Sequence, residues 1–137
     1  MDKLLEMKKI IVLFGRGEIG KTRTLRMVVD KLEEKPLSYS IADIRTVIQS
    51  QEKKVVVTTW GDNEGEILEN IAYMRKNEPF DVAITAARTY GKTHAPIEAY
   101  AKEIGCDILW FKKTFEEGDE RIVNERYADK IVDMAQH

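Results

Sequence analysis

The chain has 137 residues, a size typical of one domain, and with 43% hydrophobic and 34% charged residues it is neither disordered nor fibrous in composition. Its 22 basic and 24 acidic residues are scattered along the sequence, so neither nucleic acid nor an anionic membrane is indicated as a partner. The apolar runs are far shorter than the ~20 residues of a membrane-spanning helix. No leader pattern is recognised, and the single Cys106 cannot form an internal disulfide, so we expect a reducing, cytoplasmic setting.

Apolar periodicity predicts the elements of the first half of the chain. Residues 10–14 are a continuous apolar run, typical of a strand covered on both faces. After a glycine-rich loop, residues 25–32 carry an apolar stripe at helical spacing, and Pro36 is expected to stop this helix. Residues 43–48 and 54–60 are rich in β-formers and are joined by the polar segment QSQEKK, which predicts a hairpin.

The second half continues the same alternation. A helix is predicted for residues 66–76, a buried strand for 80–86, and a helix that ends at Gly105. Residues 107–111 (DILWF) predict a last strand. The C-terminal segment predicts a helix whose apolar stripe is Val123, Tyr127, Ile131 and Met134.

Strands that alternate with helices predict an α/β fold: a three-layer, mostly parallel sheet with flanking helices and one β-hairpin. We expect residues 1–137 to form a single domain, because no linker, repeat or low-complexity tract interrupts the pattern. In such folds ligands bind at the carboxyl ends of the strands.

The segment FGRGEIGKT fits two nucleotide-binding patterns. Gly15, Gly17 and Gly20 form the G-x-G-x-x-G pattern of dinucleotide sites, whereas Gly15, Gly20, Lys21 and Thr22 form the phosphate-loop pattern G-x-x-x-x-G-K-[ST]. The dinucleotide reading needs an acidic residue at the end of a second strand and gives Lys21 and Thr22 no role. The strand before the motif and the helix after it favour the phosphate loop over a dinucleotide site or a structural turn.

Each part of this loop has a physical purpose. We expect the glycines to adopt backbone angles that side chains forbid, so that the loop turns its N–H groups towards an anion. The helix that follows adds the positive end of its dipole. Lys21 is the predicted catalytic contact to the β- and γ-phosphates, and the Thr22 hydroxyl is a predicted Mg²⁺ ligand. The predicted nucleotide-binding set is Gly15, Arg16, Gly17, Glu18, Ile19, Gly20, Lys21, Thr22 and Arg23.

Residues 8–32 resemble the Walker A region of P-loop NTPases. The glycine spacing is similar to that of small GTPases and of the class formed by partition ATPases and the nitrogenase iron protein. The resemblance implies a nucleoside triphosphate and Mg²⁺ as ligands. Glu18 stands where these loops usually have glycine, so its side chain is expected to point outward. Arg16 stands where the second class has a lysine that reaches the partner's nucleotide, which leaves a homodimer open beside the simpler role of a solvated arginine.

Phosphoryl transfer also needs an acidic residue near the metal, at the end of a strand. Asp62 follows the run VVVTTWG and is the favoured second metal-site residue. Asp43 is the alternative, in a switch-like segment at the expected start of a strand, and Asp81 is expected at the opposite edge of the sheet. The alternative, that Asp62 together with Asn63 and Gly61 forms only a turn and helix cap, is equally compatible with the sequence.

Arg88 follows the strand of residues 80–86 and is predicted to contact the transferred phosphate as a second catalytic residue. Lys92, Thr93 and His94 share its loop and allow a second anion site. The simpler interpretation is an exposed polar loop in which Thr93 caps the next helix.

These features predict a protein that binds a nucleoside triphosphate with Mg²⁺ and either hydrolyses it slowly or switches conformation with it. ATP is favoured over GTP because the N/T-K-x-D motif that reads guanine is missing from the predicted strand-end loops. The first alternative is a kinase that acts on a small acceptor. The lack of an insertion that could form a lid over the phosphates argues against it. The second is a non-catalytic interaction protein with the same fold.

Overall fold

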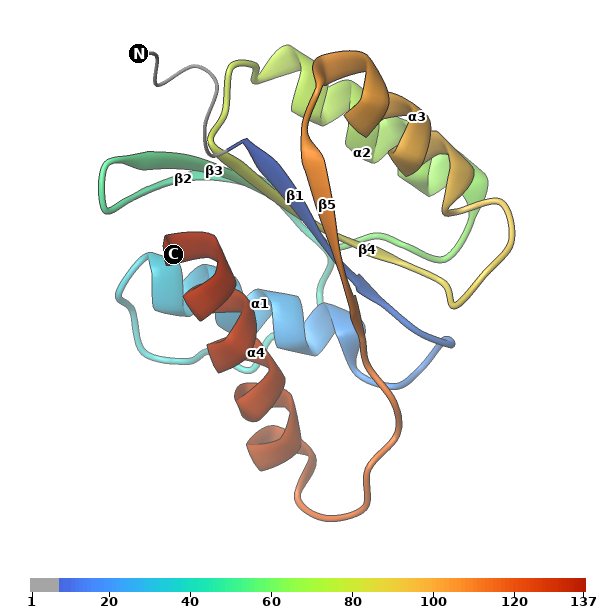
Figure 1. The fold of residues 1–137 in the computed structure, drawn as a ribbon. Helices are drawn as coiled ribbons and strands as arrows, with labels where there is room; N and C mark the ends of the chain where they lie inside the picture. The colour runs from blue at the N-terminus through green and yellow to red at the C-terminus, as the bar shows by residue number, and fades with distance from the viewer. Residues whose placement is uncertain (1–7) are drawn as a thin grey trace.

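The computed structural model describes residues 8–137, which form a five-stranded sheet with helices on both faces (Figure 1). In chain order the elements are β1 (Lys9–Phe14), α1 (Lys21–Leu32), β2 (Arg45–Ser50), β3 (Lys53–Thr58), α2 (Glu64–Lys76), β4 (Val82–Ala87), α3 (Ala95–Ile104), β5 (Asp107–Lys112) and α4 (Glu120–Gln136).

The strands lie in the order β2-β3-β4-β1-β5. β3, β4, β1 and β5 run parallel to one another, and β2 runs antiparallel to β3. Ser50 pairs with Lys53, so residues 51 and 52 alone form the turn of this hairpin. The predicted mostly parallel sheet with one hairpin is therefore confirmed.

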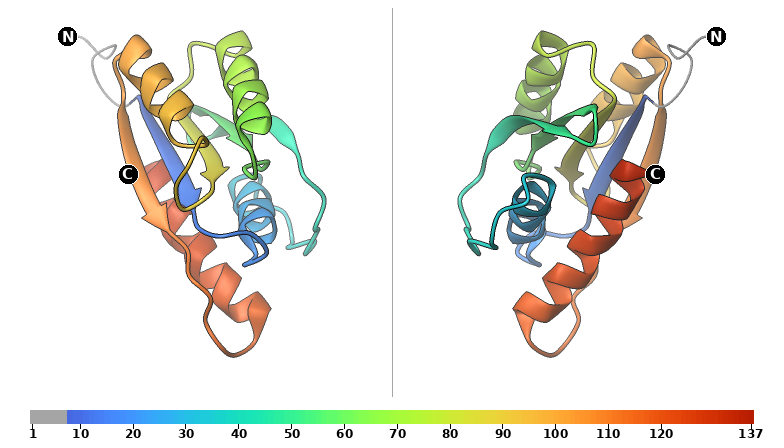
Figure 2. Two further views of the ribbon diagram at one scale, coloured as in Figure 1. Left: turned by 90° about the vertical axis from the view of Figure 1, so that its right-hand side faces the viewer. Right: turned by 90° about the vertical axis from the view of Figure 1, so that its left-hand side faces the viewer.

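The helices form two outer layers. α1 and α4 cover one face of the sheet, and α2 and α3 cover the other (Figures 1 and 2). In β1, Ile11 and Leu13 pack into the first layer, and Ile10 and Val12 pack into the second. Because both faces of β1 are covered, its sequence is a continuous apolar run.

The helix boundaries follow local chemistry, with one correction to the sequence analysis. α3 ends where Gly105 takes a left-handed conformation (φ 70°), as predicted. α1 ends at Leu32, the last residue of the predicted apolar stripe and before Pro36. In α4 the buried positions are Val123, Asn124, Ala128, Ile131 and Ala135, so the face is rotated from the predicted stripe. Tyr127 and Met134 are only partly buried.

The topology creates a crevice at the carboxyl ends of the strands. β1 and β5 lead to α1 and α4 on one face, whereas β3 and β4 lead to α2 and α3 on the other (Figure 2). Since β1 and β4 are neighbours, their following loops diverge to opposite faces. Such a switch point is where open α/β sheets bind ligands.

No helix within residues 8–137 combines the length and apolar character needed to cross a bilayer.

Candidate functional site

The glycine-rich loop, residues 15–20, lies at this switch point and connects β1 to α1. The Gly15 N–H donates to the carbonyl oxygen of Ala87 at the end of β4 (3.1 Å). On the other side of β1, the Lys113 N–H donates to the carbonyl oxygen of Phe14 (2.8 Å). The start of the loop is thus fixed between the ends of β4 and β5.

The glycines of the loop serve different purposes. Gly20 has a left-handed backbone (φ 90°), as expected, and Glu18 shares this conformation (φ 59°) with its side chain exposed. Gly15 and Gly17 do not lie in the left-handed region, so the expectation of special backbone angles is wrong for them. Gly15 is needed for space, because a Cβ there would overlap the Lys113 carbonyl oxygen. A Cβ at Gly17 would lie 2.7 Å from a guanidinium nitrogen of Arg88, the movable end of a flexible side chain.

Lys21, the first residue of α1, folds back over the loop. Its Nζ donates to the carbonyl oxygens of Gly15 and Arg16, both at 2.7 Å. The residue is only 7% exposed, and this burial lowers the pKa of the ammonium group to about 8, partly offset by the negative charge of Asp62. The loop therefore holds a desolvated cation at its centre.

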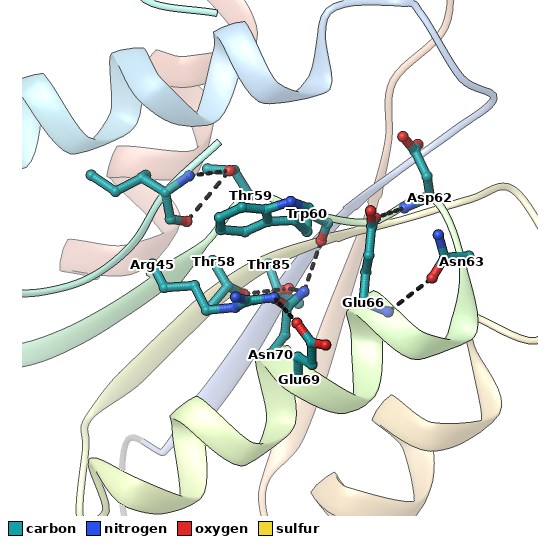
Figure 3. A network of polar contacts seen from close by, with 11 residues as sticks. Arg45, Thr58, Thr59, Trp60, Asp62, Asn63, Glu66, Glu69, Asn70 and Thr85 are labelled. Atoms are coloured by element: carbon teal, nitrogen blue, oxygen red, sulfur yellow. Dashed lines mark hydrogen bonds and ion pairs between the residues drawn. The ribbon is translucent and has the colours of Figure 1, made fainter. Parts of the chain in front are cut away.

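The Thr22 hydroxyl lies beside the carboxylate of Asp43, which was the alternative metal-site residue in the sequence analysis. The Thr22 hydroxyl donates to Asp43 Oδ1 (3.0 Å), and the Thr59 hydroxyl donates to the same oxygen (2.7 Å). Thr59, which follows β3, also accepts the Ile44 N–H (2.8 Å; Figure 3). Asp43 lies just before β2, close to the expected start of this strand. Its hydrogen bonds to Thr22 and Thr59 fix it between α1 and the end of β3.

Asp62 has a different partner. Its Oδ1 lies 3.3 Å from Arg88 Nε in an ion pair of partly exposed side chains. Asn63 caps α2 by accepting the Glu66 N–H, while the Glu66 carboxylate accepts the Asp62 N–H, both at 2.9 Å (Figure 3). The cap therefore belongs to Asn63, and the Asp62 carboxylate faces Arg88.

A buried polar network fixes the end of β3 against α2 (Figure 3). The Asn70 amide donates to the Trp60 carbonyl oxygen (2.7 Å) and accepts from Arg45 Nε (2.9 Å). The Arg45 guanidinium lies 4.1 Å from the centroid of the Trp60 ring, and the Thr58 hydroxyl donates to that of Thr85 (2.7 Å). These contacts fix the chain just after Thr59.

The loop after β4 holds the backbone of Arg88. The Arg88 N–H donates to Thr93 Oγ1 (3.1 Å), and His94 Nε2 lies 2.6 Å from the Arg88 carbonyl oxygen. The His94 ring stacks on Trp110, with 4.5 Å between centroids. The suggested cap role of Thr93 is wrong, because His94 is the N-cap of α3 and Thr93 bonds to Arg88. Lys92 is exposed.

A cavity of about 540 Å³ opens beside the loop. The predicted residues Glu18, Ile19, Gly20, Lys21, Thr22 and Arg23 line one side of it, together with Asp43 and Asp62. The other side comes from the β5–α4 connection and the start of α4. Arg16 is exposed, and Arg88 contacts the loop at Gly17.

Within the described part of the chain, no group of three or more His, Cys, Asp and Glu side chains is placed to hold a metal ion. Beside the loop, the hydroxyl of Thr22 donates to the carboxylate of Asp43, which brings two oxygen atoms together.

The chain matches no model of a known protein family and no curated protein.

Thr59, Phe115 and Asn124 shape the site but were not among the residues predicted from the sequence. Asn124 left a signal, because it precedes Ala128, Ile131 and Ala135 at helical spacing and is a polar residue in the buried face of α4. Thr59 and Phe115 carry no such signal, because their significance comes from contacts with distant segments.

Proposed function

We propose that residues 15–22 form a phosphate loop of the P-loop NTPase type, which binds a nucleoside triphosphate, ATP in the first place, together with Mg²⁺. The observation that carries this proposal is the buried Lys21 ammonium group held by the carbonyl oxygens of Gly15 and Arg16. A desolvated cation beside a helix N-terminus and a glycine loop is suited to multiply charged phosphate. Its position at the switch point of the sheet supports the same function.

The residues beside Thr22 fit a bound Mg²⁺. The Thr22 hydroxyl and Asp43 Oδ1 are hard oxygen atoms 3.0 Å apart. We assign the carboxylate role to Asp43 in place of Asp62, because the Asp43 carboxylate accepts a hydrogen bond from the Thr22 hydroxyl, the other proposed metal ligand, whereas the Asp62 carboxylate lies beside Arg88. When bound, Mg²⁺ would neutralise charge that develops on the phosphates. Thr59 holds the Asp43 carboxylate towards Thr22.

The site favours slow hydrolysis or a switch over rapid turnover. Asp43 accepts two hydroxyl hydrogen bonds, and Asp62 is paired with Arg88, so both carboxylates are engaged. A carboxylate that is already paired is a poor general base for water. Arg88 approaches the loop at Gly17, from where its guanidinium can bind the terminal phosphate once the pair with Asp62 opens.

Substitution of Lys21 tests the binding site. ATP with Mg²⁺ at 100 times its dissociation constant should stabilise the wild type by about 2.7 kcal/mol. Lys21→Ala should remove this stabilisation, and Lys35→Ala, at an exposed lysine beyond the far end of α1, should retain it. Thermal unfolding and calorimetry with ATP, GTP, ADP and NAD, with and without Mg²⁺, measure the effect. Equal ATP binding by wild type and Lys21→Ala would refute the phosphate loop.

Two aspartate variants locate the metal. Asp43→Asn should abolish the gain in ATP affinity that Mg²⁺ provides, because it weakens a hard oxygen ligand. Asp62→Asn should keep that gain, since its carboxylate faces Arg88. Calorimetric titrations of ATP with Mg²⁺ or EDTA measure both. The reverse pattern would assign the metal to Asp62, as the sequence analysis favoured.

The kinase alternative is tested by following ADP release with and without small acceptors, including nucleoside monophosphates. Release that does not depend on the acceptor supports hydrolysis, whereas release that requires one supports a phosphotransferase.

A further inference from the structure

The cavity extends beyond what the phosphates need. Its volume of about 540 Å³ falls in the range of sites for whole small molecules. Gly20, Lys21 and Thr22 line only one side. The other side is formed by the β5–α4 connection and α4, and apart from the buried Lys113 its lining residues offer no cation to a phosphate, so this side requires its own explanation.

Two exposed apolar side chains lie on this cavity. Phe115, in the β5–α4 connection, is 64% exposed, and Ile41, in the α1–β2 connection, is 68% exposed. Each would be unremarkable alone. Together they line one cavity from two separate connections, and an aromatic ring beside an aliphatic chain offers a surface for a planar heteroaromatic ring.

The two connections are held together near the cavity. The guanidinium of Arg121 on α4 lies 4.0 Å from the centroid of the Tyr39 ring in the α1–β2 connection. Arg23 on α1 forms an ion pair with Glu120 on α4. These contacts bring the segments that carry Ile41 and Phe115 to the same part of the molecule.

Asn124 supplies a polar contact to the same cavity. It is 1% exposed, lines the cavity and lies against Gly20, where a Cβ would be 3.0 Å from its amide. Among residues 8–137, no group donates a hydrogen bond to its Oδ1. Buried acceptors are normally satisfied, so this oxygen points to a donor outside the described residues.

The acidic residues nearby are already paired. Glu116 accepts from Arg126 and from the Tyr127 hydroxyl, and Glu120 pairs with Arg23. The Asn124 amide is therefore the uncommitted acceptor among these polar groups.

We propose that this side of the cavity binds the nucleoside of the triphosphate. The base packs against Phe115 and Ile41, and an N–H or O–H of the nucleoside donates to Asn124 Oδ1. The ligand is then a complete nucleotide in place of a bare polyphosphate. This inference rests on the proposed function, since the phosphate loop holds the other end of the ligand.

Calorimetry with ATP and with inorganic tripolyphosphate, both with Mg²⁺, tests the stacking contact. The wild type should bind ATP at least tenfold more tightly than tripolyphosphate, since one base stacked on an aromatic ring contributes an effect of about that size. Phe115→Ala should weaken ATP binding by about tenfold and leave tripolyphosphate binding unchanged. Ile122→Ala, an exposed apolar residue of α4 outside the cavity lining, should change neither.

The outcomes separate this inference from the proposed function. If neither ligand binds, both fail. If tripolyphosphate binds as tightly as ATP, or if Phe115→Ala weakens both ligands equally, the phosphate loop stands and the nucleoside site is refuted.

Modified nucleotides locate the donor to Asn124 without altering the protein. Inosine triphosphate lacks the exocyclic amine of ATP, and 2′-deoxy and 3′-deoxy ATP each lack one ribose hydroxyl. A loss of fivefold or more with inosine triphosphate identifies the base amine, and the same loss with a deoxy analogue identifies the ribose. Equal binding of all four nucleotides overturns the role of Asn124.

Discussion

At the scale of single residues, Lys21 is subject to two opposing influences on its charge: burial disfavours the ammonium form, and an anion would favour it. It is buried, which lowers the pKa of its ammonium group to about 8, and it lies at the centre of a loop suited to anions. In the free protein the neutral form is therefore populated above pH 8. A bound polyphosphate favours the charged form, so ligand binding in this range requires the uptake of a proton.

The affinity for tripolyphosphate should consequently fall as the pH rises. We expect little change from pH 7 to 7.5 and a decrease that approaches about tenfold per pH unit above pH 8, where free Lys21 is neutral. Lys21→Arg stays charged throughout and should lose this slope, even if its affinity at pH 7 is lower. Titrations from pH 7 to 9.5 measure both proteins. The same slope in wild type and Lys21→Arg would place the titrating group elsewhere.

At the scale of secondary-structure elements, the hairpin of β2 and β3 is closed by an unfavourable turn. Gln51 and Glu52 connect the paired residues Ser50 and Lys53, and both have left-handed backbones (φ 50° and 66°). Two-residue turns with positive φ at both positions favour Asn-Gly. The hairpin therefore depends on its other contacts, including the hydrogen bond from Arg45 to Asn70 of α2.

Replacement of residues 51 and 52 by Asn-Gly should stabilise the protein. Relief of the left-handed strain is worth about 1 kcal/mol, or about 3 °C in the melting temperature of a chain of this size. Gln51→Val should be destabilising, because a β-branched residue tolerates positive φ poorly. Urea and thermal unfolding measure both variants. A neutral or harmful Asn-Gly turn would show that the turn is not strained in solution.

At the scale of the whole molecule, burial decreases from the centre of the sheet to the connections at the cavity. β4 is buried along its whole length, and β1 lies beside it with only its end residues partly exposed. The segments that line the cavity outside the glycine loop include the connections at residues 33–44 and 113–119, which have no regular secondary structure. The proposed ligand site therefore joins a buried sheet to irregular connections, the parts of a fold that open most readily.

Hydrogen exchange should reproduce this gradient. Amides of β1 and β4 should exchange most slowly, and those of residues 33–44 and 113–119 fastest. Saturating ATP with Mg²⁺ should slow exchange in residues 15–22 and 113–119 more than in α2 and α3, which lie on the other face of the sheet. Equal protection across the whole chain would argue against a ligand at this edge.

Features that leave a local pattern in the sequence could be predicted, whereas contacts between distant segments could not. Periodicity indicated every strand and helix, because burial on one or both faces leaves a local pattern. The pairing of Thr22 with Asp43, and of Asp62 with Arg88, depends on how loops more than twenty residues apart meet at the end of the sheet. Contacts between distant segments leave no local sequence pattern, so the two aspartates could be recognised as candidates but not assigned to their partners.

The hydrogen bonds of Lys21 also have a consequence for how tightly any ligand can be held. The carbonyl oxygens of Gly15 and Arg16 accept the hydrogen bonds of the Lys21 ammonium group that a phosphate would otherwise accept. A phosphate that binds to Lys21 would therefore have to displace them. Because both are main-chain groups, side-chain substitution at these positions cannot remove the competition. In the proposed function the Lys21 ammonium group would exchange these carbonyl oxygens for phosphate oxygens, which would moderate the affinity for the ligand.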